Sequence, residues 1–474
     1  MTEGCREINE NFSKHADKPA LLYGDNCWTY TELLVEGWRR VVFWRSQGLV
    51  PGSKVLLYLP ENRLEYLLAV LACSLGGYEI VSVSQKASFG EVQHICELTQ
   101  PDLKWSGDSG ELPSEIGVVE ASFRDVQVIF FTSGSSSSPK GVSHDFVTLL
   151  ANARSFNQRA GLGEEVKMLH VMPTGYMAGL LNTFLSPLMA GGSVILGDVF
   201  DMKSCLNFWS MVRGKNVNAM WLTPSMVAAL TPLCRGEETR SWTRLNLRHV
   251  FVGTAPLHAA VREAFCDRAG VGCLESYGMT ECMFISVNSS KASDLEGSVG
   301  LLLSGVKIEV RDSDGAVLSP DQEGSIWVHS SYASGGYLDA SSQPVPVLDA
   351  NGWFDTGDIG KVDAGGHLFI TGRRKDLIIH GGTNVSPKQV EDVLLKYPGV
   401  KDVAVVGVSH PFWVEEVIAF LIPESDILLE EKALTIFCGE LLNSDAVPSR
   451  FIFVDSFPES SNGKVQKHIL RQNI

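Results

Sequence analysis

In the first part of the chain, short apolar runs alternate with longer segments whose apolar residues recur at helical spacing. The strand-like run Val55–Leu59 is followed by the helix-like segment Asn62–Ser74 and then by a second strand-like run, Ile80–Val83. This order predicts strands that pair in parallel through a crossover helix. The alternation continues at residues 128–131, 145–157, 168–172, 177–189, 194–196, 219–222 and 249–252. We therefore expect α/β subdomains with parallel sheets to about residue 296.

The pattern changes near Gly297. Lys307–Val310 and Ser325–Val328 are short, alternating and bounded by turn residues, which predicts an antiparallel sheet or small β-barrel over residues 297–371. Further on, the pattern indicates helices at 386–397 and 429–442 and strands at 400–408 and 416–422. The expected fold is α/β, with a large N-terminal domain at 1–372 and a small, mobile α+β domain at 373–474.

Composition and charge narrow the class of protein. The 474 residues carry a formal net charge of −16, which disfavours binding to nucleic acid or to anionic membranes. The ten cysteines include no CxxC pair, which is typical of reduced thiols in a reducing compartment. No apolar stretch approaches the roughly 18 residues of a membrane span, and the N-terminus lacks the apolar core of a signal peptide. We expect a cytoplasmic monomer or homodimer.

The strongest local feature is the serine-rich segment at residues 132–142, which follows an apolar strand-like run. Its glycine and hydroxyl residues leave backbone N–H groups accessible and supply O–H donors, and Lys140 adds a positive charge. These are the groups that bind a polyphosphate. The order of a Walker A loop is absent, and the serine run alone is also compatible with a flexible loop.

Four further segments contain chemically suitable groups, although each is weak evidence alone. Glu275–Glu281 combines an aromatic ring for a purine with a hydroxyl for a phosphate and a carboxylate for Mg²⁺. Trp353–Asp358 places a carboxylate on a turn, where it could accept hydrogen bonds from ribose hydroxyls. Gly372–Pro387 joins a basic cluster to a Gly-Gly pair. Asn462–Lys464 lies ten residues from the C-terminus.

In this order and spacing, the five segments resemble the superfamily of adenylate-forming enzymes. That superfamily contains acyl- and aryl-CoA synthetases, the adenylation domains of peptide synthetases, and beetle luciferases. The resemblance extends from Trp28–Leu33 to Lys464 and includes Pro173–Gly179, Gly253–Leu257 and Gly297–Gly300. It implies that ATP and a carboxylic acid form an acyl-adenylate with release of pyrophosphate, after which the acyl group passes to a thiol.

The resemblance also implies roles for individual residues. Lys464, Thr280 and Glu281 would be catalytic, with Glu281 holding Mg²⁺. Tyr277 would stack on adenine, Asp358 would bind the ribose, and Lys464 would bridge the substrate carboxylate and the α-phosphate. The implied ATP-binding residues are Thr132, Ser133, Gly134, Ser135, Ser136, Lys140, Gly253, Thr254, Ala255, Pro256, Tyr277, Gly278, Asp358 and Arg373. Lys375 would be the hinge of the C-terminal lobe, and Gly381 and Gly382 would line the tunnel for the thiol.

The acyl pocket is expected to be apolar, since its predicted members are Tyr176, Met177, Gly179, Trp221, Met279, Cys282 and Met283. Amino-acid-activating relatives have an aspartate where this chain has Met177, so an aliphatic or aromatic acid is favoured over an α-amino acid. CoA is the expected acceptor, and the phosphopantetheine of a separate carrier protein is the alternative. The sequence is also compatible with a degenerate, non-catalytic nucleotide-binding member of the superfamily and with an oxygen-using, luciferase-like enzyme.

One position departs from the pattern of the superfamily. Ser137 stands where its members usually have glycine. If that residue needs a positive φ angle, serine would introduce strain of about 1 kcal/mol.

Overall fold

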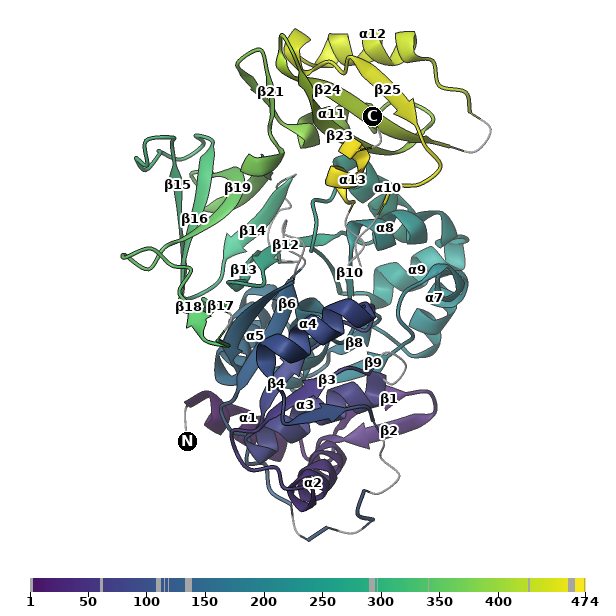
Figure 1. The fold of residues 1–474 in the computed structure, drawn as a ribbon. Coiled ribbons are helices and arrows are strands. Elements are labelled where there is room, and N and C mark those ends of the chain that lie inside the picture. The colour runs from purple at the N-terminus through teal and green to yellow at the C-terminus, as the bar shows by residue number, and fades with distance from the viewer. Residues whose placement is uncertain are drawn as a thin grey trace.

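The computed structural model describes most of the chain, as a body made of the N-terminal residues and a C-terminal lobe above it (Figure 1). The described residues are 3–59, 63–107, 112–114, 116–117, 119–132, 139–289, 295, 297–339, 341–424, 427–458, 465–472 and 474. The mixed α/β class predicted from the sequence is confirmed. Among the described helices, none combines the length and the apolar character needed to cross a bilayer.

One sheet of seven strands has the order β18-β17-β7-β6-β4-β3-β5. Strands β3, β4, β5 and β6 are parallel, and β7 turns back antiparallel to β6. The strand bounds are β3 Lys54–Leu57, β4 Glu79–Ser82, β5 Leu103–Trp105, β6 Gln127–Thr132, β7 Lys140–Asp145, β17 Gly336–Leu338 and β18 Pro344–Val345. The crossover helix α3 (Arg63–Gly76) provides the parallel connection that was predicted between β3 and β4, and α4 (Phe89–Thr99) provides a second one, between β4 and β5, that was not predicted.

A second sheet of thirteen strands has the order β15-β16-β19-β20-β14-β13-β12-β11-β10-β8-β9-β1-β2. From β1 to β12 neighbouring strands are parallel, and from β12 to β15 they are antiparallel. The first half comprises β1 Pro19–Tyr23, β2 Asn26–Thr29, β8 Lys167–His170, β9 Ser193–Leu196, β10 Ala219–Leu222, β11 His249–Val252 and β12 Leu274–Met279.

The antiparallel half contains most strands of the region 297–371, where an antiparallel sheet or small barrel was expected, but β17 and β18 of that region pair into the seven-stranded sheet. The strands of the antiparallel half are β13 Met283–Val287, β14 Ser298–Leu302, β15 Val306–Arg311, β16 Gly324–Ser330, β19 Phe354–Val362 and β20 His367–Arg373. Strand pairing runs on from β12 through β13 to β14, so this unit continues the parallel sheet.

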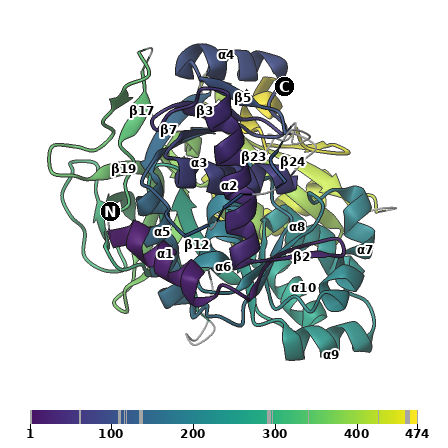
Figure 2. The same ribbon diagram turned by 90° about the horizontal axis from the view of Figure 1, so that it is seen from below.

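Helices pack around these sheets, and α3 is buried along its whole length. That burial explains why its sequence is apolar on every face. Figure 2 shows α1 and α2 at the end of the molecule away from the C-terminal lobe. The other helices of the body are α1 Glu3–Lys14, α2 Tyr30–Ser46, α5 Phe146–Ala160, the π-helix η1 Ala178–Leu185, α6 Ser186–Met189, α7 Met202–Gly214, α8 Pro224–Leu230, η2 Thr231–Leu233, α9 Glu237–Asn246 and α10 Ala259–Ala269.

The C-terminal lobe has its own five-stranded sheet and its own apolar core. The sheet order is β22-β21-β24-β23, with β25 parallel to β24. The strands are β21 Ile378–His380, β22 Thr383–Val385, β23 Val400–His410, β24 Val414–Pro423 and β25 Arg450–Phe453. The helices are η3 Arg374–Asp376, α11 Pro387–Leu394, α12 Glu431–Leu441, η4 Ser444–Ala446 and α13 Lys467–Gln472. This composition agrees with the predicted α+β character.

Candidate active site

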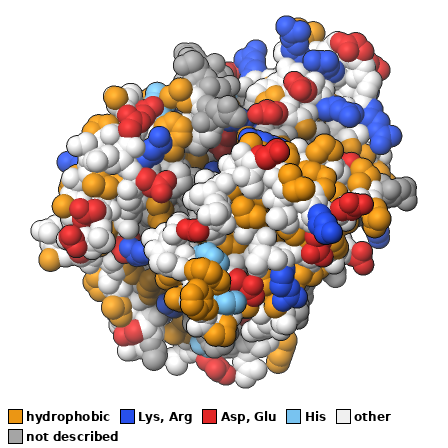
Figure 3. All heavy atoms as spheres, turned by 90° about the horizontal axis from the view of Figure 1, so that it is seen from above, with side chains coloured by type: hydrophobic (Ala, Val, Ile, Leu, Met, Phe, Trp, Pro, Cys, Tyr) orange, Lys and Arg blue, Asp and Glu red, His pale blue; other side chains and the backbone are white. Residues whose placement is uncertain are grey.

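A cavity of about 2080 Å³ lies between the body and the C-terminal lobe. The adjacent strands β10, β11 and β12 all end at it, and Thr223, Thr254 and Thr280 follow or lie close beyond these ends. Ligands of open α/β sheets bind at the carboxyl ends of parallel strands. The C-terminal lobe contributes part of the wall from α11, β23 and residues 465–471. Figure 3 views the face carrying this lobe, where acidic and basic side chains are interspersed.

Most of the predicted site residues that the structure describes line this cavity. They are Thr132, Lys140, Tyr176, Met177, Trp221, Thr254, Ala255, Pro256, Tyr277, Gly278, Met279, Thr280, Glu281, Met283, Asp358, Arg373 and Lys375. Five predicted residues are not part of its lining: Gly179, Gly253, Cys282, Gly381 and Gly382. Ser133, Gly134, Ser135, Ser136 and Lys464, and the unusual Ser137, lie outside the described residues.

Thr280 and Glu281 lie at the tip of the tight hairpin between β12 and β13, where Met279 pairs with Met283. A Cβ atom on Gly278 would lie 2.4 Å from the carbonyl oxygen of Met283. Only glycine therefore fits at that position of the hairpin. The sequence predicted the tip residues, but it gave no sign that a whole strand, β12, precedes them.

A buried histidine fixes the hairpin tip from the neighbouring sheet. His144, on β7, donates a hydrogen bond from Nε2 to the carbonyl oxygen of Thr280 at 2.6 Å. Burial lowers the pKa of His144 to about 4, so the ring is neutral near pH 7. The strand that follows the serine-rich segment is thereby joined to the Thr280–Glu281 tip. Sequence reasoning missed His144, because it belongs to no motif.

Tyr337 joins Lys140 to Glu281. Its hydroxyl donates a hydrogen bond to Glu281 Oε1 at 2.6 Å, and Lys140 Nζ lies 5.2 Å from the centre of its ring. Strand β17 brings Tyr337 here by pairing with β7, where Tyr337 is opposite Val142. Burial and the charge of Glu281 raise the pKa of Tyr337, so its hydroxyl stays protonated and can donate. The sequence contained no signal for this residue.

Asp358 is almost fully buried and has two partners in the site. The hydroxyl of Tyr277 donates to Asp358 Oδ2, and Arg373 Nε lies 2.9 Å from Oδ1. The pairing of β19 with β20 sets Asp358 directly opposite Arg373. Burial and the nearby Asp358 raise the pKa of Tyr277 well above its usual value. These contacts hold the Tyr277 ring and the Asp358 carboxylate in fixed positions at the cavity wall.

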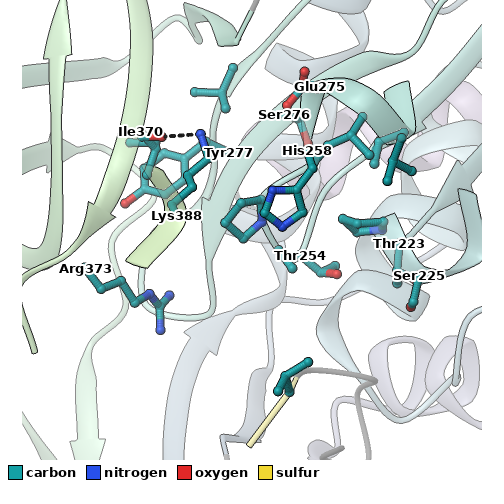
Figure 4. Close-up of a pocket in the computed structure, with 18 of the residues that line it drawn as sticks. Thr223, Ser225, Thr254, His258, Glu275, Ser276, Tyr277, Ile370, Arg373 and Lys388 are labelled. Atoms are coloured by element: carbon teal, nitrogen blue, oxygen red, sulfur yellow. Dashed lines mark hydrogen bonds between the residues drawn. The ribbon is translucent and has the colours of Figure 1, made fainter. Parts of the chain in front are cut away.

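The turn at Gly253–Pro256 follows β11. Thr254 has a φ angle of 73°, a left-handed conformation that is uncommon for a residue with a side chain. Thr254, His258 and Tyr277 all line the cavity, and Figure 4 labels each of them. Gly253 is the first residue of the turn, and an added Cβ there would be 3.0 Å from Ser276 Oγ and 3.2 Å from Trp221 Cζ2.

At one end the cavity wall is mainly apolar. Trp221 is packed among aromatic rings, with the centre of Phe251 5.4 Å and that of Phe284 5.3 Å from its own. Its indole N–H is buried and has no hydrogen-bond partner among the described residues. Asn182, on η1, also lines the cavity and is only 5% exposed. Sequence reasoning missed Asn182, because it lies within an apolar, helix-like run.

Two other predicted pocket residues have packing roles. A Cβ on Gly179 would lie 2.0 Å from the carbonyl oxygen of Pro173, so glycine allows η1 to approach the preceding loop. Cys282 is buried within the core beside the hairpin tip, and burial raises its pKa.

Gly381 and Gly382 form the exposed turn between β21 and β22, outside the cavity. Their φ angles are 59° and 93°, and the ring of Trp413 packs beside Gly381. Lys375, in η3 between β20 and β21, lines the cavity and is exposed. In this arrangement the α11 face of the lobe lines the cavity, and the Gly381–Gly382 face does not.

Comparisons with known proteins agree with this geometry. The AMP-binding enzyme family matches residues 104–338, and the C-terminal domain of the AMP-binding enzymes matches residues 389–464. The 2-succinylbenzoate–CoA ligase of Bacillus licheniformis is 30% identical over 96% of each chain. The feruloyl-CoA synthase of an Amycolatopsis species is 28% identical, over 98% of this chain and 96% of the relative.

Among solved structures, the o-succinylbenzoate coenzyme A synthetase of Bacillus subtilis, in complex with ATP and magnesium ion, superposes with a TM-score of 0.83. It is 26% identical over 98% of this chain and 99% of that one. The chain belongs to the AMP-binding enzymes, the class to which its fold and its two-lobed site point. Within that class it is an AMP-forming acid–thiol ligase.

Proposed function

We propose that this enzyme joins a carboxylic acid to AMP at the cavity, with release of pyrophosphate, and then passes the acyl group to the thiol of CoA. The observation that carries the proposal is the convergence of Lys140, Thr280, Glu281, Asp358 and Arg373 on one cavity. These residues come from four separate parts of the chain. Relatives that span almost its whole length are named as CoA ligases.

Each part of ATP has a complementary group in the site. The Tyr277 ring offers a face for adenine, and the buried Asp358 carboxylate can accept hydrogen bonds from ribose hydroxyls in addition to those from Tyr277 and Arg373. Thr132 and Lys140, which pair with each other across β6 and β7, suit the β- and γ-phosphates. The resemblance extends this assignment to Ser133, Gly134, Ser135 and Ser136.

Glu281 fits as a magnesium ligand. Its Oε1 atom is oriented by Tyr337, and its side chain lines the cavity. In the described part of the chain, no group of three or more His, Cys, Asp or Glu side chains could hold a metal. Mg²⁺ often takes one carboxylate together with nucleotide phosphates and water, so a single Glu281 suffices. When bound, the ion would offset phosphate charge and favour departure of pyrophosphate.

The reaction has two steps. A carboxylate oxygen of the acid bonds to the α-phosphorus, and the bond from that phosphorus to the pyrophosphate oxygen breaks. The thiol then loses its proton to water, its sulfur bonds to the acyl carbon, and the bond from that carbon to the phosphate oxygen breaks as AMP leaves. The first step brings two anions together, and Lys140 and Arg373 supply positive charge at the cavity. The resemblance gives Lys464 the role of bridging the carboxylate and the α-phosphate.

The proposed substrate is a largely apolar acid with one hydrogen-bonding group. Met177, Trp221, Met279 and Met283 offer apolar surface at the acyl end, and no acidic side chain occupies the position of Met177 to pair with an ammonium group. Asn182 adds a buried amide there. The amide can both donate and accept hydrogen bonds, so a carbonyl, hydroxyl or similar group of the acid would pair with it.

The test is an acid-dependent exchange of labelled pyrophosphate into ATP across fatty, aryl and amino acids. We expect aliphatic or aromatic acids with a polar substituent to support exchange, and α-amino acids to fail. The best acid is then offered with CoA or with a carrier protein bearing phosphopantetheine. Thioester formation on the carrier protein alone would replace CoA with the alternative acceptor, and exchange with no acid at all would overturn the proposal.

A further inference from the structure

A histidine–aspartate contact crosses the boundary between the two lobes beside the cavity. His258 precedes α10 of the body, and Asp392 lies on α11 of the C-terminal lobe. His258 Nδ1 and Asp392 Oδ1 are 2.6 Å apart. The two side chains are 19% and 33% exposed, so water screens the contact only in part. Figure 4 shows the His258 ring in the middle of the cavity wall, between Thr254 and Ser276.

The α11 helix is held against the body by neighbouring contacts as well. Lys388 Nζ donates to the carbonyl oxygen of Ile370 at 3.3 Å, drawn as a dashed line in Figure 4. Just before the helix, Ser386 Oγ donates to the carbonyl oxygen of Thr371 at 3.0 Å. Both acceptors belong to β20, the strand that ends at Arg373. The His258–Asp392 contact adds a second anchor, on α10, and so restricts rotation of α11 about β20.

The charges around His258 come from three elements of the C-terminal lobe. Asp392, Glu391 and Lys388 lie on α11, Asp402 lies on β23, and Lys467 of α13 pairs with Glu391 at 2.6 Å. Burial lowers the pKa of His258, but the hydrogen bond to Asp392 and the charges of Glu391 and Asp392 outweigh it. The pKa of His258 is therefore raised above its ordinary value of 6.5.

We propose that His258 and Asp392 form a positioning contact that holds the C-terminal lobe in the orientation used for adenylate formation. The inference rests on the proposed function. In this orientation α11, β23 and residues 465–471 line the cavity, whereas Gly381 and Gly382 do not. The resemblance implies that transfer to the thiol uses the Gly381–Gly382 face, and turning the lobe to bring that face to the cavity would separate Asp392 from His258. The contact thus favours the first step over the second.

The test compares the two half-reactions in His258→Gln and Asp392→Asn, which change the contact from opposite lobes. The control is His367→Gln, which removes a histidine–aspartate pair of similar exposure that lies within the body, His367 with Asp363 at 3.2 Å. We expect pyrophosphate exchange to fall about tenfold in both variants, since a charge-assisted contact of this kind is lost. Transfer from supplied acyl-adenylate to the thiol should stay within about twofold of the control.

The pH dependence provides a second readout. The pKa of His258 is raised in this orientation. The contact therefore stabilises the orientation fully below about pH 6.5, and this stabilisation is lost as the pH rises through the raised pKa. The ratio of exchange to transfer should fall over that rise in the wild type, and His258→Gln should lack this fall. An equal loss of both half-reactions, or no loss of exchange, would overturn the proposal.

Failure of the proposed function itself can be recognised separately. If the wild type catalyses neither half-reaction with any acid, the proposed function is wrong. The lobe contact is then tested by NMR titration of ¹³C-labelled histidine, with His258→Gln to assign the signal. A His258 pKa above 6.5 that returns toward 6.5 in Asp392→Asn would support the contact. A value that Asp392→Asn leaves unchanged would overturn it.

Discussion

Thr254, which lines the cavity, has a left-handed backbone with φ at 73°. Left-handed backbone costs a residue with a Cβ about 1–2 kcal/mol. Glycine would remove that strain. Its greater conformational freedom in the unfolded chain would, however, lower the free energy of unfolding by about 0.4–1 kcal/mol. We therefore expect Thr254→Gly to raise the free energy of unfolding by about 0.5–1 kcal/mol, measured by urea denaturation.

The control for this prediction is Thr223→Gly. Thr223 has an ordinary φ of −84° and caps α8 through its side chain, so glycine there should destabilise the protein. Strain is common at functional sites. If Thr254→Gly is also destabilising, the threonine side chain stabilises the turn by more than its backbone costs.

Tyr337 orients the proposed magnesium ligand through a single hydroxyl group. Tyr337→Phe removes the 2.6 Å hydrogen bond to Glu281 and keeps the ring beside Lys140. Groups that orient a metal ligand typically contribute about tenfold or more to metal affinity. We expect the Mg²⁺ concentration for half-maximal pyrophosphate exchange to rise about tenfold. The control is Tyr332→Phe, because the Tyr332 hydroxyl donates to the carbonyl oxygen of Ser304, away from the cavity. This variant should leave the half-maximal Mg²⁺ concentration unchanged. An equal response in both variants would contradict the role of Tyr337.

At the scale of elements, apolar periodicity predicted the strands and helices that are buried. Val128–Phe131 and His249–Val252 are central strands, and their side chains are apolar and mostly buried. The polar run Lys140–Asp145 was missed as a strand. It becomes β7 because it pairs with β6 along its whole length and with β17 from far along the chain. Such pairing overrides local preference, and it is also what places His144 and Tyr337 in the site.

The sequence allowed prediction of those candidate site residues that belong to motifs recognised by their order and spacing. Asp358 and Arg373 belong to segments that were recognised by motif, and β19 and β20 set them opposite each other. Asn182 could not be predicted in this way. The apolar run at 177–189 predicted an ordinary helix, whereas residues 178–185 form a π-helix. The wider turn of a π-helix is frequent at functional sites, and here its Asn182 lines the cavity.

The π-helix therefore carries a prediction about specificity. In Asn182→Leu the buried amide is replaced by an apolar group of similar size. Acids with a hydrogen-bonding substituent should lose kcat/KM by about tenfold or more relative to their hydrocarbon analogues, since a lost hydrogen bond in a closed pocket typically costs about 1–3 kcal/mol. Competition between the two acids in the exchange assay measures the ratio. An unchanged ratio would mean that Asn182 does not contact the acid.

At the scale of the whole molecule, the proposed two-step reaction uses two faces of one lobe at one cavity. The described orientation brings α11 and β23 to the cavity and leaves the turn at Gly381–Gly382 exposed. The groups that we propose bind the nucleotide come from both sheets of the body. The lobe is a separate unit with its own core. A small unit joined through the short η3 segment can change orientation without disturbing either core.

Gly382 tests this two-face arrangement. An added Cβ at Gly382 has no neighbour within 4 Å, so in the described orientation Gly382→Leu meets no steric obstacle. Its φ of 93° adds backbone strain, which Gly315→Leu reproduces as a control, because Gly315 has a φ of 85° and equally open space. We expect pyrophosphate exchange to match that of the control.

Transfer to CoA should respond differently. In the proposed second orientation the Gly381–Gly382 face lies at the cavity, and a leucine side chain there would obstruct the path of the thiol. We expect Gly382→Leu to lower the rate of transfer from supplied acyl-adenylate by about ten- to a hundredfold, since small misplacements of reacting groups have effects of that size. Rapid-quench measurement of each half-reaction separates the two effects. If the rates of exchange and transfer fall together, the substitution acts through folding. If neither rate falls, the thiol reaches the cavity without the Gly381–Gly382 face. Only a selective loss of transfer requires that the lobe turn between the two steps.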